Sequence, residues 1–229
     1  MIVLGLETST RACSVAVSDG AGLLATMTVL GHERPSDQLL ASVERCLQVA
    51  GLAVSAVEGI AVSAGPGSFT GLRIGVTAAK TLAYVLGRPV VAVSSLDVLA
   101  ANVPAPRWPL WVLVDARKEK LYAARYEVGP DGEGLPCRQG PEQLITLDRL
   151  LPQLTGELLL LGDALIRYGA QLLAAPGAQC HVLPPALWMP QAATVCRLGA
   201  LALAQGTAGD PHALAPRYLY SKESDITGW

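Results

Sequence analysis

The feature that most constrains the fold of this chain is a pattern that occurs twice. Ile2–Leu6 is an uninterrupted apolar run that ends in an acid, Glu7, and an alternating segment begins six residues later at Cys13. In the second half, Leu110–Val114 ends in Asp115, and another strand-like segment again begins six residues later. Short apolar runs bounded by turn residues are typical of buried β-strands. The repetition predicts two related lobes, each opening with a strand that ends in a carboxylate.

Helical patterns lie between the strand patterns of the first lobe, so we expect an α/β class with a mixed sheet flanked by helices. One predicted helix opens at Pro35 and stops before Gly51, and a second over Leu72–Leu86 is apolar on nearly all sides, which requires cover on both faces. The other elements expected here are strands Ile2–Leu6, Cys13–Val17, Leu23–Val29, Gly59–Val62 and Val90–Val93, and a short helix Leu96–Ala101.

The second lobe is expected to follow a proline-rich hinge, Val103-Pro104-Ala105-Pro106. The predicted domains are 1–104, completed by a C-terminal helix and tail over 190–229, and a smaller lobe over 105–189. Within the smaller lobe we expect strands Leu110–Val114, Leu121–Val128 and Leu158–Leu161, a loose turn at 131–134, and helices Gln143–Leu154 and Ala164–Ala175. The long helix is predicted over Gln191–Ala204 and the extended tail from Pro216 onward.

Charge is scarce in this chain. Hydrophobic residues make up 51% of it and charged residues 16%, below the roughly 25% typical of soluble domains, so we expect a partner to cover some apolar surface. The net charge of −2 gives no basic footprint for nucleic acid. The absence of a leader pattern and of an apolar stretch near ~20 residues predicts a cytoplasmic protein with no membrane span. Five scattered cysteines favour buried, reduced thiols.

Carboxylates at strand ends suggest the actin-like ATPase architecture, in which such acids face a cleft and hold Mg-nucleotide. The alternative for Glu7 and Asp115 is a structural one, as solvated turn acids or as a cap, such as Glu7 beside Thr8 and Ser9. The three histidines, His32, His181 and His212, are far apart and form no metal-binding pair. The sequence therefore predicts no metal site.

The glycine-rich loop Gly65-Pro66-Gly67-Ser68-Phe69-Thr70-Gly71 is the strongest local motif. Its glycines permit tight turns, Ser68 or Thr70 could cap the next helix, and free N–H groups at that helix start could bind an anion. A Walker A loop is excluded because Leu72-Arg73 follows Gly71. A structural turn is favoured over a phosphate site. If a nucleotide cleft exists, its residues are Glu7, Gly65, Gly67, Ser68, Gly71 and Asp115.

Gly65–Ala100, together with the opening Leu6-Glu7-Thr8-Ser9-Thr10 and with Val114-Asp115-Ala116-Arg117, closely resembles the bacterial TsaB (YeaZ) family. The resemblance covers most of the chain. It implies a two-lobed actin-like ATPase fold of the ASKHA, ribonuclease H-like type. It also implies a role in making threonylcarbamoyladenosine in tRNA, at the adenosine beside the anticodon.

The resemblance further implies a set of partners. The chain would pair with the catalytic subunit TsaD and join TsaE in a larger complex, and it would meet tRNA only through that complex. A homodimer through the same helices is a further expectation. No cofactor is expected in the isolated chain, although ATP or ADP could bind at the joint with TsaD.

The resemblance also predicts a subunit without catalytic residues. The His-x-x-x-His metal motif of TsaD corresponds here to Ser95 and Leu99, and a further TsaD aspartate corresponds to Pro190. Serine, leucine and proline cannot replace imidazole and carboxylate as metal ligands. The competing interpretations are a self-sufficient ATPase or sugar-kinase-like phosphotransferase that uses the candidate cleft, and a metalloprotease, which the missing ligands disfavour.

In that family, two helices, here over roughly 36–50 and 69–86, pack on their TsaD counterparts as a four-helix bundle. This implies an interface on the apolar positions of both helices. Packing into the chain's own core alone would explain about half of the same residues. The predicted interface residues are Leu39, Leu40, Val43, Leu47, Leu72, Val76, Ala79 and Ala83.

Overall fold

Two five-stranded sheets, each with its own helices, organise the chain in the computed structural model, which describes residues 1–20, 22–31, 35–129 and 134–220 but not the side chains of 35–37. The first compact unit comprises Met1–Val98 and Pro190–Arg217, and the second comprises Leu99–Met189 with the described residues 218–220. The predicted α/β class with mixed sheets flanked by helices is confirmed.

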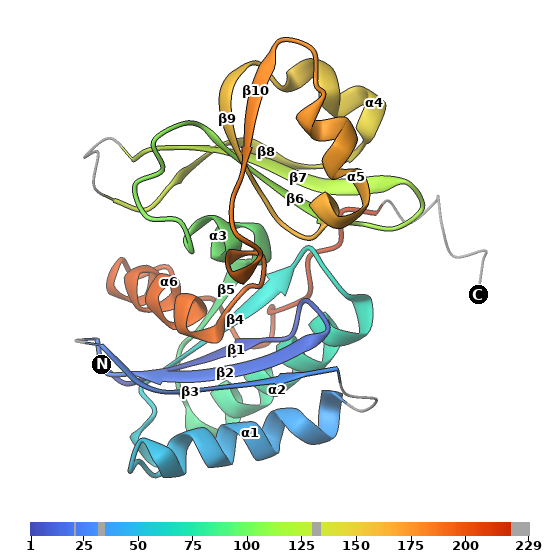
Figure 1. Ribbon diagram of the computed structural model, residues 1–229. Helices are drawn as coiled ribbons and strands as arrows, with labels where there is room; N and C mark the ends of the chain where they lie inside the picture. The colour runs from blue at the N-terminus through green and yellow to red at the C-terminus, as the bar shows by residue number, and fades with distance from the viewer. Residues whose placement is uncertain (21, 32–34, 130–133, 221–229) are drawn as a thin grey trace. The chain divides into compact units, whose positions relative to one another are not determined.

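The sheet of the first unit has the strand order β3-β2-β1-β4-β5 (Figure 1). The first three strands form an antiparallel meander, whereas β4 runs parallel to β1 and β5 runs parallel to β4. The apolar runs of β1 and β4 make these two strands buried on both faces, as parallel strands between helix layers are. The strands are β1 (Val3–Glu7), β2 (Ala12–Ser18), β3 (Leu23–Leu30), β4 (Gly59–Gly65) and β5 (Val90–Ser94).

Helices cover both faces of this sheet (Figure 1). On one face, α1 (Pro35–Val49) packs against β2 and β3, and α2 (Phe69–Leu86) packs mainly against β4. On the other face, α6 (Ala192–Ala204) packs against β1, β2, β4 and β5. The two resulting cores lie on opposite sides of the sheet, the larger one under α1 and α2.

The helix α6 approaches the sheet closely because each side of the contact has a glycine, Gly199 on α6 and Gly5 on β1. A Cβ at Gly199 would lie 2.3 Å from the Cβ of Ala61, and one at Gly5 would lie 2.6 Å from the Sγ of Cys196. The Cys196 thiol contacts the carbonyl oxygens of Val3 and Ala16 at 3.4 and 3.3 Å, and burial raises its pKa to about 12. Cys196 is therefore a packing residue in its reduced form.

The sheet of the second unit has the order β10-β9-β6-β7-β8. Its core lies under α4 (Leu147–Leu150) and α5 (Ala164–Leu173). The strands are β6 (Leu110–Asp115), β7 (Lys120–Glu127), β8 (Cys137–Thr146), β9 (Gly156–Leu161) and β10 (Ala178–Val182). The remaining elements are α3 (Ser95–Ala100) and three single 3-10 turns, Val54–Ala56, Leu151–Gln153 and Pro185–Leu187. Among the described residues, no helix is long and apolar enough to cross a lipid bilayer.

One element prediction in the second unit is wrong in its first part, and one strand has no counterpart among the predicted elements. The helix predicted over Gln143–Leu154 is a strand as far as Thr146, because Leu144 and Ile145 pair with Tyr122 and Leu121 of β7 and that pairing overrides a helix-like spacing. The strand β10 was not predicted, because its mixed Ala-Gln-Cys-His-Val sequence shows no apolar run. The turn predicted at 131–134 lies outside the described residues except for Gly134, and so does the tail beyond 220.

The boundaries of the units also differ from those predicted. The first unit ends at Val98 rather than at residue 104. The Asn102 side chain amide donates to the carbonyl oxygens of Leu187 and Met189, which holds this segment in the second unit. Residues 218–220 also belong to the second unit instead of completing the first. The Tyr220 hydroxyl donates to the Ala116 carbonyl oxygen at 2.7 Å, which explains that assignment.

The packing of α6 predicts that Gly199→Ala destabilises the protein. The new methyl group would overlap Ala61, and overpacking of this kind costs about 1–3 kcal/mol. The higher helix propensity of alanine offsets at most about 1 kcal/mol of this cost. Urea unfolding measures the net loss. The matched control is Gly169→Ala on α5, where a Cβ meets nothing within 4 Å, and we expect it to raise stability. A stability gain in both variants would contradict the close packing of α6.

Candidate functional site

The glycine-rich loop connects β4 to α2 and is held by the chain segment that follows β1. The Ser68 hydroxyl caps α2 by accepting from the N–H of Gly71 at 3.2 Å. The backbone N–H of Ser68 donates to the Ser9 carbonyl oxygen at 2.7 Å, and the Thr8 hydroxyl donates to the Gly71 carbonyl oxygen at 2.8 Å. The predicted capping by Ser68 is confirmed, and the first turn of α2 is bonded to residues 8 and 9.

The glycines of this loop make room for that contact. A Cβ at Gly71 would lie 2.0 Å from the Thr8 carbonyl oxygen, and one at Gly67 would lie 2.4 Å from the Ser9 carbonyl oxygen. A Cβ at Gly75, one helical turn later, would lie 2.2 Å from the Thr8 hydroxyl oxygen. Glycine is required wherever two backbones approach this closely. The geometry therefore favours the structural turn over the phosphate site.

Gly65 has a different role at the start of the same loop. Its φ of +115° lies in a region that residues with side chains rarely adopt. A Cβ there would lie 2.5 Å from the Arg217 carbonyl oxygen, and the Arg217 N–H donates to the Ala64 carbonyl oxygen at 2.7 Å. The C-terminal segment of the first unit is thus bonded to the end of β4.

Glu7 is fully buried, and both of its carboxylate oxygens are occupied by the chain itself. Oε1 accepts from the N–H and the hydroxyl of Ser9, at 2.6 and 2.5 Å, and Oε2 accepts from the Ser63 hydroxyl. Burial raises the pKa of Glu7, although these hydrogen bonds act in the opposite direction. Glu7 therefore has a structural role, because its hydrogen bonds join the end of β1 to β4. It is not a solvated turn acid.

Asp115 ends β6 in the second unit and is described with that unit. Its backbone N–H donates to Oδ1 of Asp163 at 2.9 Å, and its own Oδ1 accepts from the Arg117 N–H at 2.9 Å. Burial and the nearby charge of Asp115 raise the pKa of Asp163. Sequence reasoning missed Asp163, although it follows the apolar strand β9 in the same strand-then-acid pattern.

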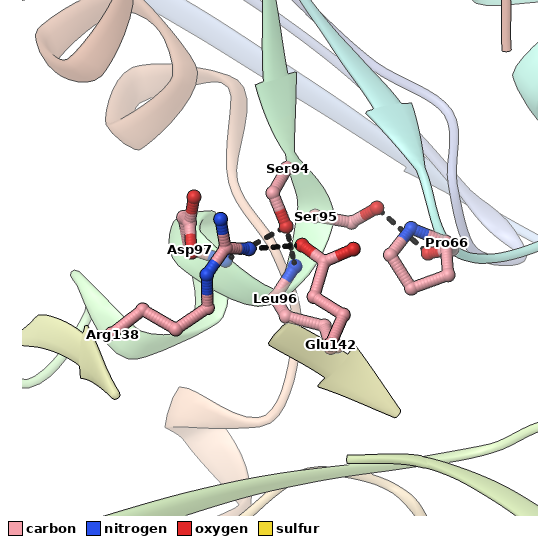
Figure 2. Close-up of polar contacts among 7 residues, drawn as sticks. All are labelled: Pro66, Ser94, Ser95, Leu96, Asp97, Arg138 and Glu142. Carbon is pink, nitrogen blue, oxygen red and sulfur yellow. Dashed lines mark hydrogen bonds and ion pairs between the residues drawn. The ribbon is translucent and has the colours of Figure 1, made fainter. Parts of the chain in front are cut away.

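Of the positions that correspond to TsaD metal ligands, Ser95 and Leu99 lie on α3, and Pro190 lies just before α6. The Ser94 hydroxyl accepts from the N–H groups of Leu96 and Asp97 and so caps α3, and the buried Ser95 hydroxyl donates to the Pro66 carbonyl oxygen at 2.7 Å (Figure 2). Leu99 is a buried core residue, and Pro190 is also buried. Ser95 therefore bonds the glycine-rich loop to α3.

No group of three or more His, Cys, Asp or Glu side chains within the described ranges is arranged to hold a metal ion. His181 stacks on Trp108, with ring centroids 4.5 Å apart, and His212 meets Tyr84 edge to face. These two histidines pack against aromatic rings in different units. His32 lies outside the described residues.

The predicted interface residues need a correction. Seven of the eight are buried in the first unit itself, which leaves Leu40, 59% exposed, as the one that reaches the surface. A helical apolar stripe shows which residues share a face, but it does not show whether the sheet or another chain covers that face. Here the sheet covers it. The buried seven are Leu39, Val43, Leu47, Leu72, Val76, Ala79 and Ala83.

Outside the core, the two helices also carry large apolar side chains that are exposed. Tyr84 is 68% exposed and Val85 is 72% exposed near the end of α2, and Phe69 is exposed at its start. Val49 is exposed at the end of α1, and the two helices pack against one another. We call this set, Leu40, Val49, Phe69, Tyr84 and Val85, the outer helix face.

The burial of Glu7 predicts how Glu7→Gln changes stability with pH. The folded pKa lies above the ordinary value of 4.5, so between the two pKa values the folded state holds a proton that the unfolded state has lost. Wild-type stability therefore falls as pH rises through that window, by about 1.4 kcal/mol per pH unit. The neutral amide of the variant does not titrate in this range. Urea unfolding from pH 4 to 8 should therefore show that the free energy of unfolding of Glu7→Gln rises relative to that of the wild type as pH increases.

The control for that experiment is Glu157→Gln, which changes an exposed carboxyl on β9. We expect its pH dependence to follow the wild type. Parallel stability curves for Glu7→Gln and the wild type would show that the buried carboxyl is not protonated on folding.

Comparisons with known proteins agree with the resemblance of the sequence to the TsaB (YeaZ) family. The sequence model of the family described as "TsaD: tRNA N6-adenosine threonylcarbamoyltransferase" matches residues 31–152, more than half of the chain. The chain is 29% identical to the tRNA threonylcarbamoyladenosine biosynthesis protein TsaB of Bacillus subtilis, over 98% of this chain and 96% of that protein. It is 32% identical to the TsaB protein of Escherichia coli over 58% of each.

Solved structures show the same relationship. YeaZ from Pseudomonas aeruginosa superimposes with a TM-score of 0.79 at 30% identity, over 95% of this chain and 99% of that one. A ROK hexokinase from Thermus thermophilus superimposes with a TM-score of 0.50 at 16% identity, over 90% of this chain and all of that one, and this likeness concerns the fold alone. The predicted actin-like ATPase fold is confirmed. The chain belongs to the TsaB (YeaZ) family, within the wider family that the TsaD sequence model describes.

Proposed function

We propose that this protein acts in the synthesis of threonylcarbamoyladenosine in tRNA as a non-catalytic partner of a TsaD subunit. The observation that carries the proposal is the outer helix face, five large apolar side chains exposed on two adjacent helices of a chain that matches TsaB proteins over nearly its full length. Large apolar side chains that stay exposed on neighbouring helices are candidates for contact with another chain.

The position of these residues supports a helix-to-helix contact. The inner side of α2 is buried in the core through Val76, Ala79 and Ala83. The helix therefore cannot rotate about its axis to bury Tyr84 and Val85. The same holds for α1, where Leu39 and Val43 face the core and Leu40 faces outward. A TsaD subunit has the same fold class in the TsaB resemblance, so its equivalent helices would present a matching surface. The heterodimer would bury the outer helix face.

The occupied carboxylate of Glu7 and the bonded hydroxyl of Ser95 support a non-catalytic role. Each of these groups holds the glycine-rich loop or its neighbours in place, and the hydrogen bonds found among the described residues join them to Ser9, Ser63 and Pro66. We therefore assign catalysis to TsaD and place this chain in the cytoplasm with it. TsaE would join the larger complex, tRNA would be contacted only through that complex, and ATP or ADP would bind only at the joint with TsaD.

The test changes the outer helix face without touching the core. In Tyr84→Glu/Val85→Glu, two exposed apolar side chains become acidic, and we expect TsaD binding to weaken at least tenfold, because interface anchors of this type contribute about 2 kcal/mol or more each. Calorimetry with purified TsaD measures the affinity, and the modification of tRNA by the reconstituted complex should fall in parallel. The unfolding midpoint of the free chain should fall only slightly, because of the lost edge-to-face contact of Tyr84 with His212.

The control is Ile166→Glu, which places one such charge on another exposed apolar residue, 79% exposed on α5 of the second unit. It should bind TsaD as the wild type does. Charges at Val43 or Val76 would not serve this purpose, because both side chains are buried in the core and their replacement would unfold the chain. Unchanged TsaD affinity in the Tyr84/Val85 variant would refute the outer helix face as the interface.

The enzyme alternative makes a separate prediction about the isolated chain. A self-sufficient ATPase or phosphotransferase requires Glu7 as a Mg-nucleotide ligand, but its oxygens already accept three hydrogen bonds. We expect titration of the isolated chain with Mg-ATP to give no binding heat and no phosphate release. Micromolar binding with turnover, lost in Glu7→Gln, would establish the enzyme instead.

A further inference from the structure

The outer edge of β3 is open in the described part of the first unit. β3 is the terminal strand of the sheet, and no described strand pairs with its outer edge (Figure 1). The opposite edge is partly covered, because Gly209 pairs with Val90 of β5 and donates its N–H to the Val90 carbonyl oxygen at 2.9 Å. An open edge presents a row of N–H and C=O groups that another strand can pair with.

β3 lacks most of the features that keep open edges from pairing. Its eight residues, Leu-Leu-Ala-Thr-Met-Thr-Val-Leu, include no charged residue, no proline and no glycine. A bulge where β2 passes from Val17 to Ser18 distorts the start of the strand, but Ala25–Leu30 pair with β2 in regular register. Leu30, at the far end, is 63% exposed. Natural edge strands usually carry a charge or a proline to prevent association.

The sequence of β3 is nearly the same when it is read in either direction from Met27. Thr26 and Thr28 flank the centre, Ala25 and Val29 follow, and Leu24 and Leu30 lie outermost. Two antiparallel copies related by a two-fold axis at Met27 would therefore place threonine opposite threonine and apolar residues opposite apolar residues. Thr26 and Thr28 are both exposed, whereas Ala25 faces the core under α1. The matching thus holds separately for each face of the sheet.

We propose that a second copy of this chain binds the outer edge of β3, which forms a two-fold symmetric dimer with a continuous sheet. Symmetric dimers need a surface that is complementary to itself, and the order of residues in β3 supplies it. A two-fold axis at Thr26 or Thr28 would instead oppose threonine with leucine. Cross-strand threonine pairs and apolar pairs stabilise antiparallel strands, and no like charges meet.

The proposed dimer is distinct from one formed through the helices. α1 packs against β2 and β3, whereas α2 packs mainly against β4, away from the open edge. The pairing of six to eight residues buries less than the ~800 Å² per partner of a standard interface. We therefore expect a concentration-dependent dimer with a dissociation constant between about 1 µM and 1 mM.

The first test exchanges charges at Thr26 and Thr28. In the proposed dimer, Thr26 of one copy lies opposite Thr28 of the other copy. Thr26→Lys/Thr28→Lys places lysine opposite lysine in a homodimer, and Thr26→Glu/Thr28→Glu places glutamate opposite glutamate. Sedimentation velocity should show that each variant alone self-associates at least tenfold more weakly than the wild type. A mixture of the two should restore the dimer, since each lysine then meets a glutamate. This restoration also shows that both variants are folded.

The matched control is Thr77→Lys/Thr81→Lys, which introduces the same charges at exposed threonines on α2. It should dimerise as the wild type does. A wild type that stays monomeric to 1 mM, lysine and glutamate variants that dimerise normally, or a dimer lost only in the α2 control would each overturn the proposal. The last of these outcomes would assign self-association to the helices instead.

The second test fixes the register. Met27→Cys, made together with Cys137→Ser to remove the exposed native thiol, places two cysteines opposite one another at the axis. Directly opposed residues have Cα atoms about 4.5–5.5 Å apart, within reach of a disulfide. Mild oxidation should give a covalent dimer, and Thr77→Cys in the same background should give none. Equal cross-linking at both positions would contradict the pairing at β3. Neither test depends on binding to TsaD, which the Tyr84/Val85 variant addresses.

Discussion

The close approach of residues 8 and 9 to the first turn of α2 is the contact on which the first unit depends. It joins the end of β1, the glycine-rich loop and the start of α2 through the Ser68 N–H and the Thr8 hydroxyl. It is sterically feasible only because positions 67, 71 and 75 lack side chains. Ser63 and Ser9 then hold the buried carboxyl of Glu7, which adds β4 to the same network. A buried acid without these donors would destabilise the unit.

This use of the loop explains how a motif that resembles an anion site can serve as a structural turn. Glycines before a helix can expose N–H groups to a phosphate, or they can admit another backbone. In this chain the carbonyl oxygens of Thr8 and Ser9 lie against Gly71 and Gly67, and the Ser68 hydroxyl caps the helix. The neighbouring Ser95 hydroxyl fixes the loop from the other side through Pro66. These groups of the loop are hydrogen-bonded to other residues of the first unit.

Sequence patterns identified most of the first unit, because its strands are uninterrupted apolar runs and its helices have clear starts and stops, such as Ser68 and Gly87 around α2. They failed where pairing with a distant strand decides the structure, as at Leu144 and Ile145 of β8, or where an edge strand has no apolar pattern, as in β10. The interface prediction failed for a related reason. Periodicity identified the stripe of Val43 and Val76 but could not show that the chain's own sheet covers it.

The two proposed surfaces of the first unit are adjacent, and their spacing has a consequence for assembly. Because α1 lies over β2 and β3, a sheet that continues across the β3 edge would bring the α1 helices of two copies near one another, whereas each α2 would remain over β4. A partner that contacts only Tyr84 and Val85 of α2 could bind while the strand dimer persists. A partner that also contacts Leu40 of α1 would compete with it. The share of the TsaD contact made by α1 therefore determines whether self-association opposes the formation of the heterodimer.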